Sequence, residues 1–258
     1  MTSYPKAAIF VLLSILLLGL VALISLREIA RTINVKENTS DIVVLIPEGF
    51  TLEKIQESLD ESGIAGAGRL SETAKPERWA EEFPFLKIIP GRVTTLEGFL
   101  FPDTYRFEKH DTAEAVVRKF LKNFEEKTKG LGVTYKTVTL ASILEREVPV
   151  KDMSLAAGVL LHRLNAGVPL QADATLVYAL GRPITASDPE TLDSPYNTYR
   201  YLGLPPTPIS NPGLEAIKAA LNPAASEYWY YLSRRDNGET IFSATLEEHN
   251  AARARYLR

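Results

Sequence analysis

One uninterrupted apolar segment constrains this chain more than any other feature. Residues 7–26 read AAIFVLLSILLLGLVALISL, and none of them carries a charge. At about 1.5 Å per residue, a helix of this length reaches about 30 Å, the thickness of a bilayer's hydrocarbon core. The segment is too long for the apolar region of a cleavable signal peptide, and Leu26-Arg27-Glu28 is a poor cleavage site. We therefore expect an uncleaved, single-pass membrane anchor here, with a short tail at residues 1–6.

The charges beside this segment do not decide its orientation. Lys6 precedes it, whereas Arg27, Arg31 and Lys36 follow it. Lys and Arg tend to collect on the cytoplasmic side, so these counts do not favour an external carboxyl end, but long domains cross membranes largely regardless of such charges. A cytoplasm-facing protein therefore stays open on these residues alone.

Composition limits the chemistry of the rest of the chain. The 258 residues are 45% hydrophobic, enough for a real core, and a net charge of -3 gives no reason to expect nucleic acid as a partner. The absence of cysteine excludes disulfides, thiolate metal sites and a cysteine nucleophile. His110, His162 and His249 lack the spacing of metal ligands, so we expect neither a metal nor another cofactor.

Several common catalytic motifs are missing from the sequence. There is no dinucleotide-binding glycine motif, phosphate-binding loop, zinc-protease motif or serine-hydrolase elbow. Carboxylates, amides, tyrosines and hydroxyls remain, and these are the groups that a carbohydrate-cleaving site uses.

The pattern of apolar residues and turn signals predicts a mixed α+β fold. Residues 27–41 read as a juxtamembrane linker, and a strand at residues 42–46 then leads to a helix capped by Thr51, which together form a small α/β unit. The turn signal Asp236-Asn237-Gly238 predicts a hairpin. Further helices are predicted at about residues 112–127, 137–148, 153–165, 174–180, 214–221 and 245–257, and β structure at residues 96–107, 228–232 and 239–242.

Four blocks of sequence carry a resemblance to a known family. They are LEGFLFPDTY (96–105), LASILERE (140–147), HRLNAGVPLQADATLVYALG (162–181) and DSPYNTYRYLGLPPTPISNPG (193–213). An IPEGFT block (46–51) and the apolar segment precede them. Because the whole set occurs in family order over nearly the entire chain, the chain resembles the MltG (YceG-like) family of endolytic peptidoglycan transglycosylases.

The resemblance implies both an architecture and a location. It implies an anchor in the inner (plasma) membrane with a cytoplasmic tail at residues 1–6, a small LysM-like subdomain at residues 42–91 and an extracytoplasmic α+β catalytic domain at residues 92–258. The family's partners would be peptidoglycan glycan strands, peptidoglycan synthases or other wall-elongation proteins, and membrane lipid around residues 7–26.

The resemblance also implies a reaction. The family cleaves the bond between N-acetylmuramic acid and N-acetylglucosamine without water, leaves a 1,6-anhydro end and so terminates strand elongation. Two positions depart from the family pattern. Ala174 stands where proline is usual, and Thr207 stands where glycine is usual. Both could shift a loop, but they leave the ionisable groups in place.

Two glutamates near the end of one predicted helix are candidates for the proton donor. Such a donor needs a pKa raised by burial. Small residues, Ala141 and Ser142, lie beside Glu145 and leave room for a sugar, whereas bulkier side chains lie below Glu147. This pattern favours Glu145 without excluding Glu147, which we expect to face solvent in a charge cluster. The resemblance assigns the catalytic acid and base to Glu145, the first glutamate of the family motif.

Other polar residues in the blocks are predicted to bind substrate. Some have a structural alternative: Asp173, Ser210 and Asn211 could cap helices, and Glu97 could bond backbone or arginine. The muramic acid's own C6 hydroxyl can attack C1, so the reaction needs no second carboxylate. The predicted substrate contacts are Glu97, Gln171, Asp173, Tyr196, Asn197, Tyr199, Ser210 and Asn211.

Two other functions stay open on the sequence. The first is a hydrolytic muramidase that uses Glu145 together with Asp173 or Glu97. The second is a non-catalytic scaffold that binds peptidoglycan within the wall-synthesis machinery.

Overall fold

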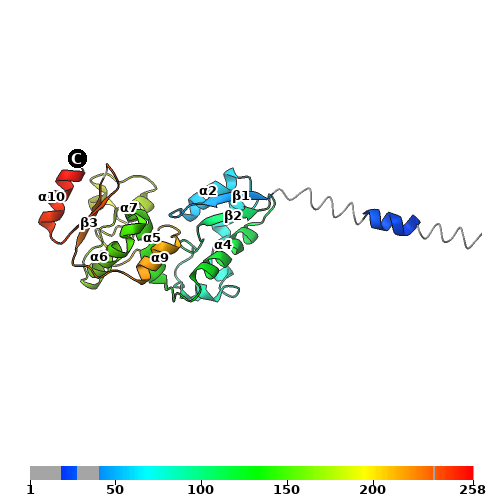
Figure 1. The fold of residues 1–258 in the computed structure, drawn as a ribbon, viewed down its shortest axis with the longest axis horizontal. Coiled ribbons are helices and arrows are strands. Elements are labelled where there is room, and N and C mark those ends of the chain that lie inside the picture. Colours follow the sequence, from blue (N-terminus) through cyan, green and yellow to red (C-terminus); the bar gives the residue numbers. More distant parts are fainter. Residues whose placement is uncertain (1–18, 28–40, 235, 258) are drawn as a thin grey trace, which may run out of the picture. The chain divides into compact units, whose positions relative to one another are not determined.

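The computed structural model describes residues 19–27, 41–234 and 236–257. Most of the predicted anchor and linker therefore lies outside the described residues, although residues 19–27 are helical (Figure 1). Within the described part of the chain, we find no helix with both the length and the apolar character needed to cross a bilayer. Val43–Arg258 forms one compact unit, and the following paragraphs concern this unit.

The first half of the unit is built on a two-stranded sheet and two longer helices. Strand β1 (Ile42–Ile46) pairs with β2 (Asp103–Phe107), and the helices are α2 (Leu52–Glu61) and α4 (Ala113–Thr128) (Figure 1). Thr51 caps α2 as predicted, because its hydroxyl accepts the backbone N–H of Lys54. Between α2 and β2 the chain forms the short helical segments η1 (Ala67–Arg69), α3 (Leu70–Thr73), η2 (Pro76–Arg78) and η3 (Pro84–Ile88).

Aromatic side chains fill the core of this half. Phe124 of α4 lies 5.2 Å from Phe99 between ring centroids, and Phe120 lies 4.5 Å from Tyr105 of β2. The rings of Phe99, Phe120 and Phe124 are fully buried. They fix the loop of residues 96–102 against α4, and this loop carries Glu97.

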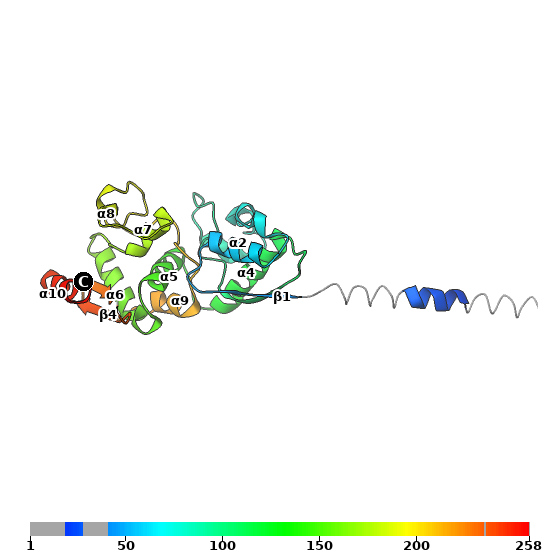
Figure 2. The same ribbon diagram turned by 90° about the horizontal axis from the view of Figure 1, so that it is seen from above.

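The second half of the unit is a helical cluster around one central helix. That helix, α5 (Tyr135–Glu147), packs against α6 (Met153–Asn165), α7 (Asp173–Leu180) and α9 (Leu214–Leu221) (Figure 2). The remaining elements are η4 (Val150–Asp152), α8 (Asp188–Thr191), the antiparallel hairpin β3 (Tyr230–Ser233) and β4 (Thr240–Ser243), and α10 (Leu246–Tyr256).

Most predicted elements are present, two alternatives that the sequence left open are excluded, and one local prediction is wrong. Helix α7 begins at Asp173 with Ala172 in the capping position, so Asp173 is not the cap. The cap of α9 is Gly213, so neither Ser210 nor Asn211 has that role. The β structure predicted at residues 96–107 is confined to β2. Before it, the amides of Gly98 and Leu100 bond to the Asn211 side chain instead of a neighbouring strand.

Candidate active site

The end of α5 presents three consecutive side chains to three different neighbours. The helix starts with a capping box between Thr134 and Thr137, and its residues from Val138 to Leu144 are buried. Pro149 follows, and the helix stops at Glu147 because a residue before proline avoids helical geometry. Glu145, Arg146 and Glu147 thus sit on a well-fixed last turn, each half-buried.

Glu145 lies against the start of α9. The backbone N–H of Gly213 donates to Oε2 of Glu145 at 3.0 Å. Burial raises the pKa of Glu145 to about 6, the Gly213 bond opposes that rise, and the negative charge of Glu48 adds to it. A glutamic acid in these surroundings keeps its proton much closer to neutral pH than an exposed one does.

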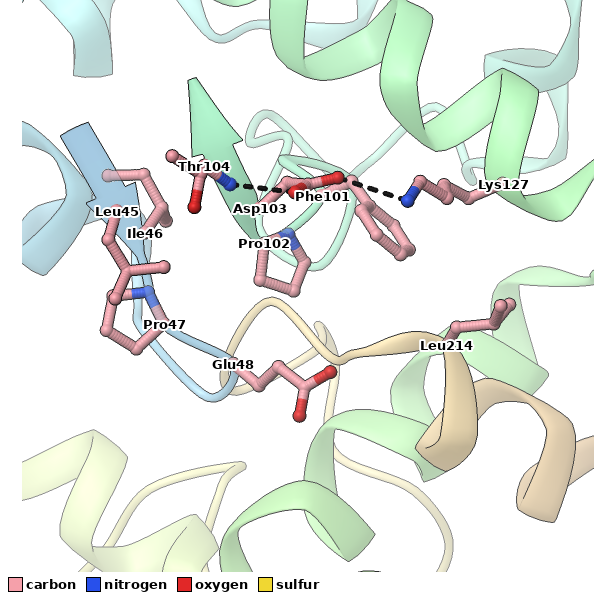
Figure 3. A pocket seen from close by; sticks show the side chains of 10 residues that line it. All are labelled: Leu45, Ile46, Pro47, Glu48, Phe101, Pro102, Asp103, Thr104, Lys127 and Leu214. Atoms are coloured by element: carbon pink, nitrogen blue, oxygen red, sulfur yellow. Dashed lines mark hydrogen bonds and ion pairs between the residues drawn. The ribbon is translucent and has the colours of Figure 1, made fainter. Parts of the chain in front are cut away.

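Glu48 belongs to the turn between β1 and α2, and its side chain reaches a pocket of about 340 Å³ (Figure 3). Leu214, which directly follows Gly213, lines the same pocket, so the pocket adjoins Glu145. Its walls are mainly apolar, and Lys127 forms an ion pair with Asp103 at 3.1 Å. The lining residues are Leu45, Ile46, Pro47, Glu48, Phe101, Pro102, Asp103, Thr104, Lys127 and Leu214.

Arg146 lies beside a buried carboxylate, Glu97, which is only 3% exposed. Both oxygens of Glu97 accept the backbone N–H of Leu52 at 3.1 Å, Asn211 donates at 2.9 Å, and the Tyr178 hydroxyl donates at 3.4 Å. Burial raises the pKa of Glu97 to about 7, and the charge of Arg146 partly opposes the rise. Of the two readings of Glu97, this geometry favours the structural partner at the start of α2.

Three other predicted contacts are buried and bonded within the protein. The Asn211 amide oxygen accepts from Gly98 and Leu100, while its nitrogen donates to Glu97 and to the Phe50 carbonyl. Ser210 donates to the carbonyl of Ser142 at 3.1 Å. Asn197 donates to the carbonyls of Pro189 in α8 and of Leu192, and its side-chain oxygen accepts from Tyr199 N–H. These bonds favour support of the loops over direct contact with a sugar.

Glu147 is not the solvent-facing residue that we predicted. Its Oε1 accepts the backbone N–H of Ala174 at 2.8 Å, in the first turn of α7. Burial raises its pKa to about 7, the nearby Asp173 charge adds to the rise, and bonds from Ala174 and Tyr231 oppose it. The prediction failed because periodicity along α5 does not show that α7 and β3 close over this side of the helix.

The QAD turn before α7 lies next to Glu147. Gln171 has a φ of 56°, a left-handed value that is rare for residues other than glycine and often marks functional sites. Arg163 holds its side-chain oxygen, and the backbone N–H of Gln171 donates to Thr198 O at 3.0 Å. The Tyr199 hydroxyl donates to Asp173. Gln171 and Asp173 are both exposed and can therefore reach a ligand.

Tyr196 connects to the Glu97 cluster through a neighbouring ring. Its centroid lies 5.2 Å from that of Tyr178, and its hydroxyl bonds Thr207 at 2.7 Å. Thr207, which replaces the usual glycine of the family block, therefore gives Tyr196 a partner. The structure groups the predicted residues in two sets. The set near Arg146 contains Glu97, Tyr196, Ser210 and Asn211. The set near Glu147 contains Gln171, Asp173 and Tyr199, and Asn197 supports the loop of Tyr199.

Sequence reasoning missed three residues of this region: Glu48, Arg146 and Arg163. Glu48 and Arg146 lie in blocks that we quoted, but a single acidic or basic residue there gave no signal of its partner. Arg163 is 8% exposed and donates to the carbonyls of Pro169 and Trp229 at 2.8 and 2.7 Å. Its position next to His162 in the third block was the available signal.

Comparison with known proteins places the chain in a family. The YceG-like family model matches residues 20–255. A Bacillus subtilis protein named endolytic murein transglycosylase is 39% identical over 175 residues, covering 63% of this chain and 48% of that protein. A Streptococcus pneumoniae protein of the same name is 30% identical over 240 residues, covering 80% of this chain and 43% of that protein. The chain thus spans less than half the length of these relatives.

A solved structure agrees with this assignment. A YceG-like protein from Listeria monocytogenes superposes with a TM-score of 0.72 at 31% sequence identity, covering 87% of this chain and 80% of that one. The agreement includes fold and sequence, and the family model extends over most of the chain. This chain belongs to the YceG-like family.

Proposed function

We propose that this chain is an endolytic murein transglycosylase with Glu145 as its catalytic acid and then base. The supporting observation is a half-buried carboxyl group with a pKa raised to about 6, held by Gly213 at the edge of a pocket. The relatives from Bacillus subtilis and Streptococcus pneumoniae are named for this activity. The substrate would be the bond from C1 of N-acetylmuramic acid to O4 of N-acetylglucosamine.

The orientation of Glu145 suits a proton donor. Gly213 occupies Oε2, and among the described residues none donates a hydrogen bond to Oε1. The proton can therefore sit on Oε1, which is free to donate it to a glycosidic oxygen. A carboxyl group fixed through one oxygen in this way loses little freedom when it meets substrate.

The reaction needs one carboxyl group. Glu145 gives its proton to the glycosidic oxygen as the C1–O4 bond breaks, and the bonding electrons leave with the N-acetylglucosamine oxygen. The C6 hydroxyl oxygen of the same muramic acid then bonds to C1, and its proton passes to the Glu145 carboxylate. No water is consumed, the product ends in a 1,6-anhydro ring, and Glu145 regains its proton.

The residues predicted to bind substrate divide into two roles in this proposal. None of the exposed Gln171 and Asp173 or the half-buried Tyr196 and Tyr199 lines the pocket, so these four would contact parts of the strand beyond it, through amide, carboxylate and aromatic groups. Glu97, Asn197, Ser210 and Asn211 are buried and support the loops that carry those contacts.

The proposal extends to location and partners. Residues 7–26 would anchor the chain in membrane lipid, with residues 1–6 in the cytoplasm and residues 92–258 outside, where peptidoglycan lies. Residues 42–91 would form the LysM-like part, and the wall synthases would be neighbours. The apolar run in the sequence supports the anchor. A reporter fused to the carboxyl terminus tests the orientation. Activity of a reporter that works only in the cytoplasm would contradict an external catalytic domain.

One observation favours a second candidate, a hydrolytic muramidase. Such enzymes use two carboxylates, and Glu48 lies close enough to Glu145 to raise its pKa. The partners considered from sequence fit less well, because Glu97 is buried against α2 and Asp173 accepts from Tyr199. Hydrolysis would leave a reducing muramic acid instead of an anhydro ring.

The deciding experiment is digestion of purified peptidoglycan with mass detection of the products. We expect the full-length chain to release 1,6-anhydro products and Glu145→Gln to be slower by about a thousandfold, since a general acid contributes 10²–10⁴-fold. Glu215→Gln is the matched control, because Glu215 is exposed on α9 and pairs with Lys218 at 2.7 Å. Most of the activity remaining in Glu145→Gln would show that another residue is the acid.

A further inference from the structure

Two acidic side chains from distant parts of the chain meet at one glycine. The N–H of Gly213 donates to Oε2 of Glu145 at 3.0 Å. A Cβ atom at Gly213 would lie only 1.8 Å from Oε1 of Glu48 and 2.3 Å from its carboxyl carbon. The carboxylate of Glu48 therefore rests on the residue that holds Glu145.

The turn that carries Glu48 is fixed to the loop before α9. Gly49 donates its N–H to the carbonyl of Asn211 at 3.0 Å, and Asn211 returns its own N–H to Phe50 O at 2.8 Å. The side-chain nitrogen of Asn211 bonds the same Phe50 carbonyl at 3.0 Å. A Cβ at Gly49 would lie 3.5 Å from Cγ of Glu145, so the turn packs directly on the acid.

The other charged groups near this site have partners of their own. They are Arg146 with the Ile209 carbonyl, Glu147 with Ala174 N–H, Glu97 with Leu52 N–H and Asn211, Glu215 with Lys218, and Asp103 with Lys127. The charge that acts on Glu145 is that of Glu48, and it raises the pKa of Glu145 in addition to the effect of burial. Glu48 itself is exposed and lines the pocket (Figure 3).

We propose that Glu48 is a positioning residue whose negative charge, lying against Gly213, keeps Glu145 protonated for its role as acid. A nearby like charge opposes the ionisation of a carboxyl group. This inference rests on the proposed function, because it acts through Glu145. In this proposal the segment around β1 and α2 contributes Glu48 to the active site, whether or not the segment also binds glycan.

The first test compares pH–rate profiles of the full-length chain. Glu145 must be protonated to act, so activity falls as pH rises through its pKa. Removing the Glu48 charge lowers that pKa and moves the fall to lower pH. We expect Glu48→Gln to be slower by about three- to tenfold at pH 7 and within about twofold at pH 5. Glu48→Asp, which keeps the charge, should retain the wild-type profile, as should the control Glu215→Gln.

A second variant displaces the charge without removing it. In Gly213→Ala the new methyl group would collide with the Glu48 carboxylate, which is flexible and can move away. The backbone of Gly213 (φ −73°, ψ 173°) suits alanine, and the N–H that binds Glu145 remains. We expect this variant to reproduce the profile of Glu48→Gln, with no further shift when the two changes are combined. A further shift in the double variant would overturn the inference.

A direct titration separates this inference from the proposed function. The Glu145 carboxyl carbon can be followed by ¹³C NMR in the full-length chain and assigned by its absence in Glu145→Gln. A lower pKa in Glu48→Gln supports the inference, and an unchanged pKa rejects it, whatever the rates do. If Glu145→Gln kept its activity, the assignment of the acid would fail, but the titration would still decide whether Glu48 acts on Glu145.

Discussion

The two faces of the last turn of α5 hold carboxyl groups in closely matched surroundings. Glu145 accepts the N–H of Gly213 at the cap of α9, and Glu147 accepts the N–H of Ala174 in the first turn of α7. Burial raises both pKa values, to about 6 and about 7. They differ in what else lies nearby. Each has a second carboxylate nearby, Glu48 for Glu145 and Asp173 for Glu147, but Glu145 adjoins a pocket, whereas Glu147 has Tyr231 as a further neighbour.

This comparison shows that a raised pKa does not by itself identify a catalytic acid. Either carboxyl group would hold a proton near neutral pH, and the more strongly shifted one is Glu147. Access decides between them, because a donor must come within hydrogen-bond reach of the substrate oxygen. Two neighbours of Glu145, Glu48 and Leu214, line the pocket, which supports access at Glu145, whereas Glu147 is bonded to the first turn of α7.

The largest expected effect is a contrast in activity between the two glutamates. Because only Glu145 gives its proton to substrate in our proposal, Glu145→Gln should lose about a thousandfold in rate and Glu147→Gln less than about tenfold. Release of anhydro products at pH 5 measures both. Circular dichroism of each variant controls for folding.

The reverse order would break the comparison. If Glu147→Gln were the inactive variant while Glu145→Gln digested peptidoglycan, the catalytic centre would lie on the α7 side, near Asp173 and Tyr199. Equal losses in both would indicate that the helix end acts as a unit, as groups in one hydrogen-bonded network often do.

The second prediction concerns the pH dependence of stability. The folded state binds a proton at Glu147 more tightly than the unfolded state does, since the pKa rises from 4.5 to about 7. The free energy of unfolding therefore falls as pH rises from about 4.5 to 7. The contribution is about 3 kcal/mol for Glu147 and about 2 kcal/mol for Glu145. Glutamine cannot ionise, so Glu147→Gln and Glu145→Gln should each lack the part of this pH-dependent fall in the free energy of unfolding that the replaced glutamate contributes.

Urea unfolding at pH 4.5 and pH 8 measures this contrast. The decline between the two pH values should shrink more in Glu147→Gln than in Glu145→Gln. Glu215→Gln, an exposed and paired residue, should leave it unchanged. An equal or larger effect for Glu145 would mean that Glu147 is the better solvated group.

The sequence predicted the helices and identified the two glutamates as candidate acids, but it could not show which groups surround each glutamate. A local signal suffices for Thr51, whose hydroxyl caps the helix that follows it. Long-range contacts do not leave such signals. The bond from Ala174 to Glu147 spans 27 residues, and that from Gly213 to Glu145 spans 68. The sequence could not decide between a structural and a substrate-binding role for Glu97, because its partners Leu52 and Asn211 lie 45 and 114 residues away along the chain.

The third prediction removes one carboxyl group completely. At pH 5, Glu147→Ala leaves the Ala174 N–H without its acceptor, and we expect a loss of about 2 kcal/mol in the free energy of unfolding. Glu145→Ala should cost about 1 kcal/mol, because loss of the side chain leaves space next to Leu214, which lines the pocket, and water can then reach the Gly213 N–H. Urea unfolding at one pH checks both. A larger cost at Glu145 would make it the structural residue of the pair.

The smallest expected effect comes from Ala174→Pro, which restores the residue usual in the family. Proline has no N–H, so Glu147 loses a bond that lowers its pKa, and that pKa should rise further. The residue before a proline avoids helical geometry, so α7 should start one residue later, with Asp173 as its cap. The stiffer unfolded chain offsets the lost bond, and the free energy of unfolding should change by less than about 1 kcal/mol.

Activity at pH 5 should stay within about twofold, because Glu145 is untouched. A loss of 100-fold or more would show that the bond between Ala174 and Glu147 holds the catalytic geometry, so that the two faces of α5 could not be separated.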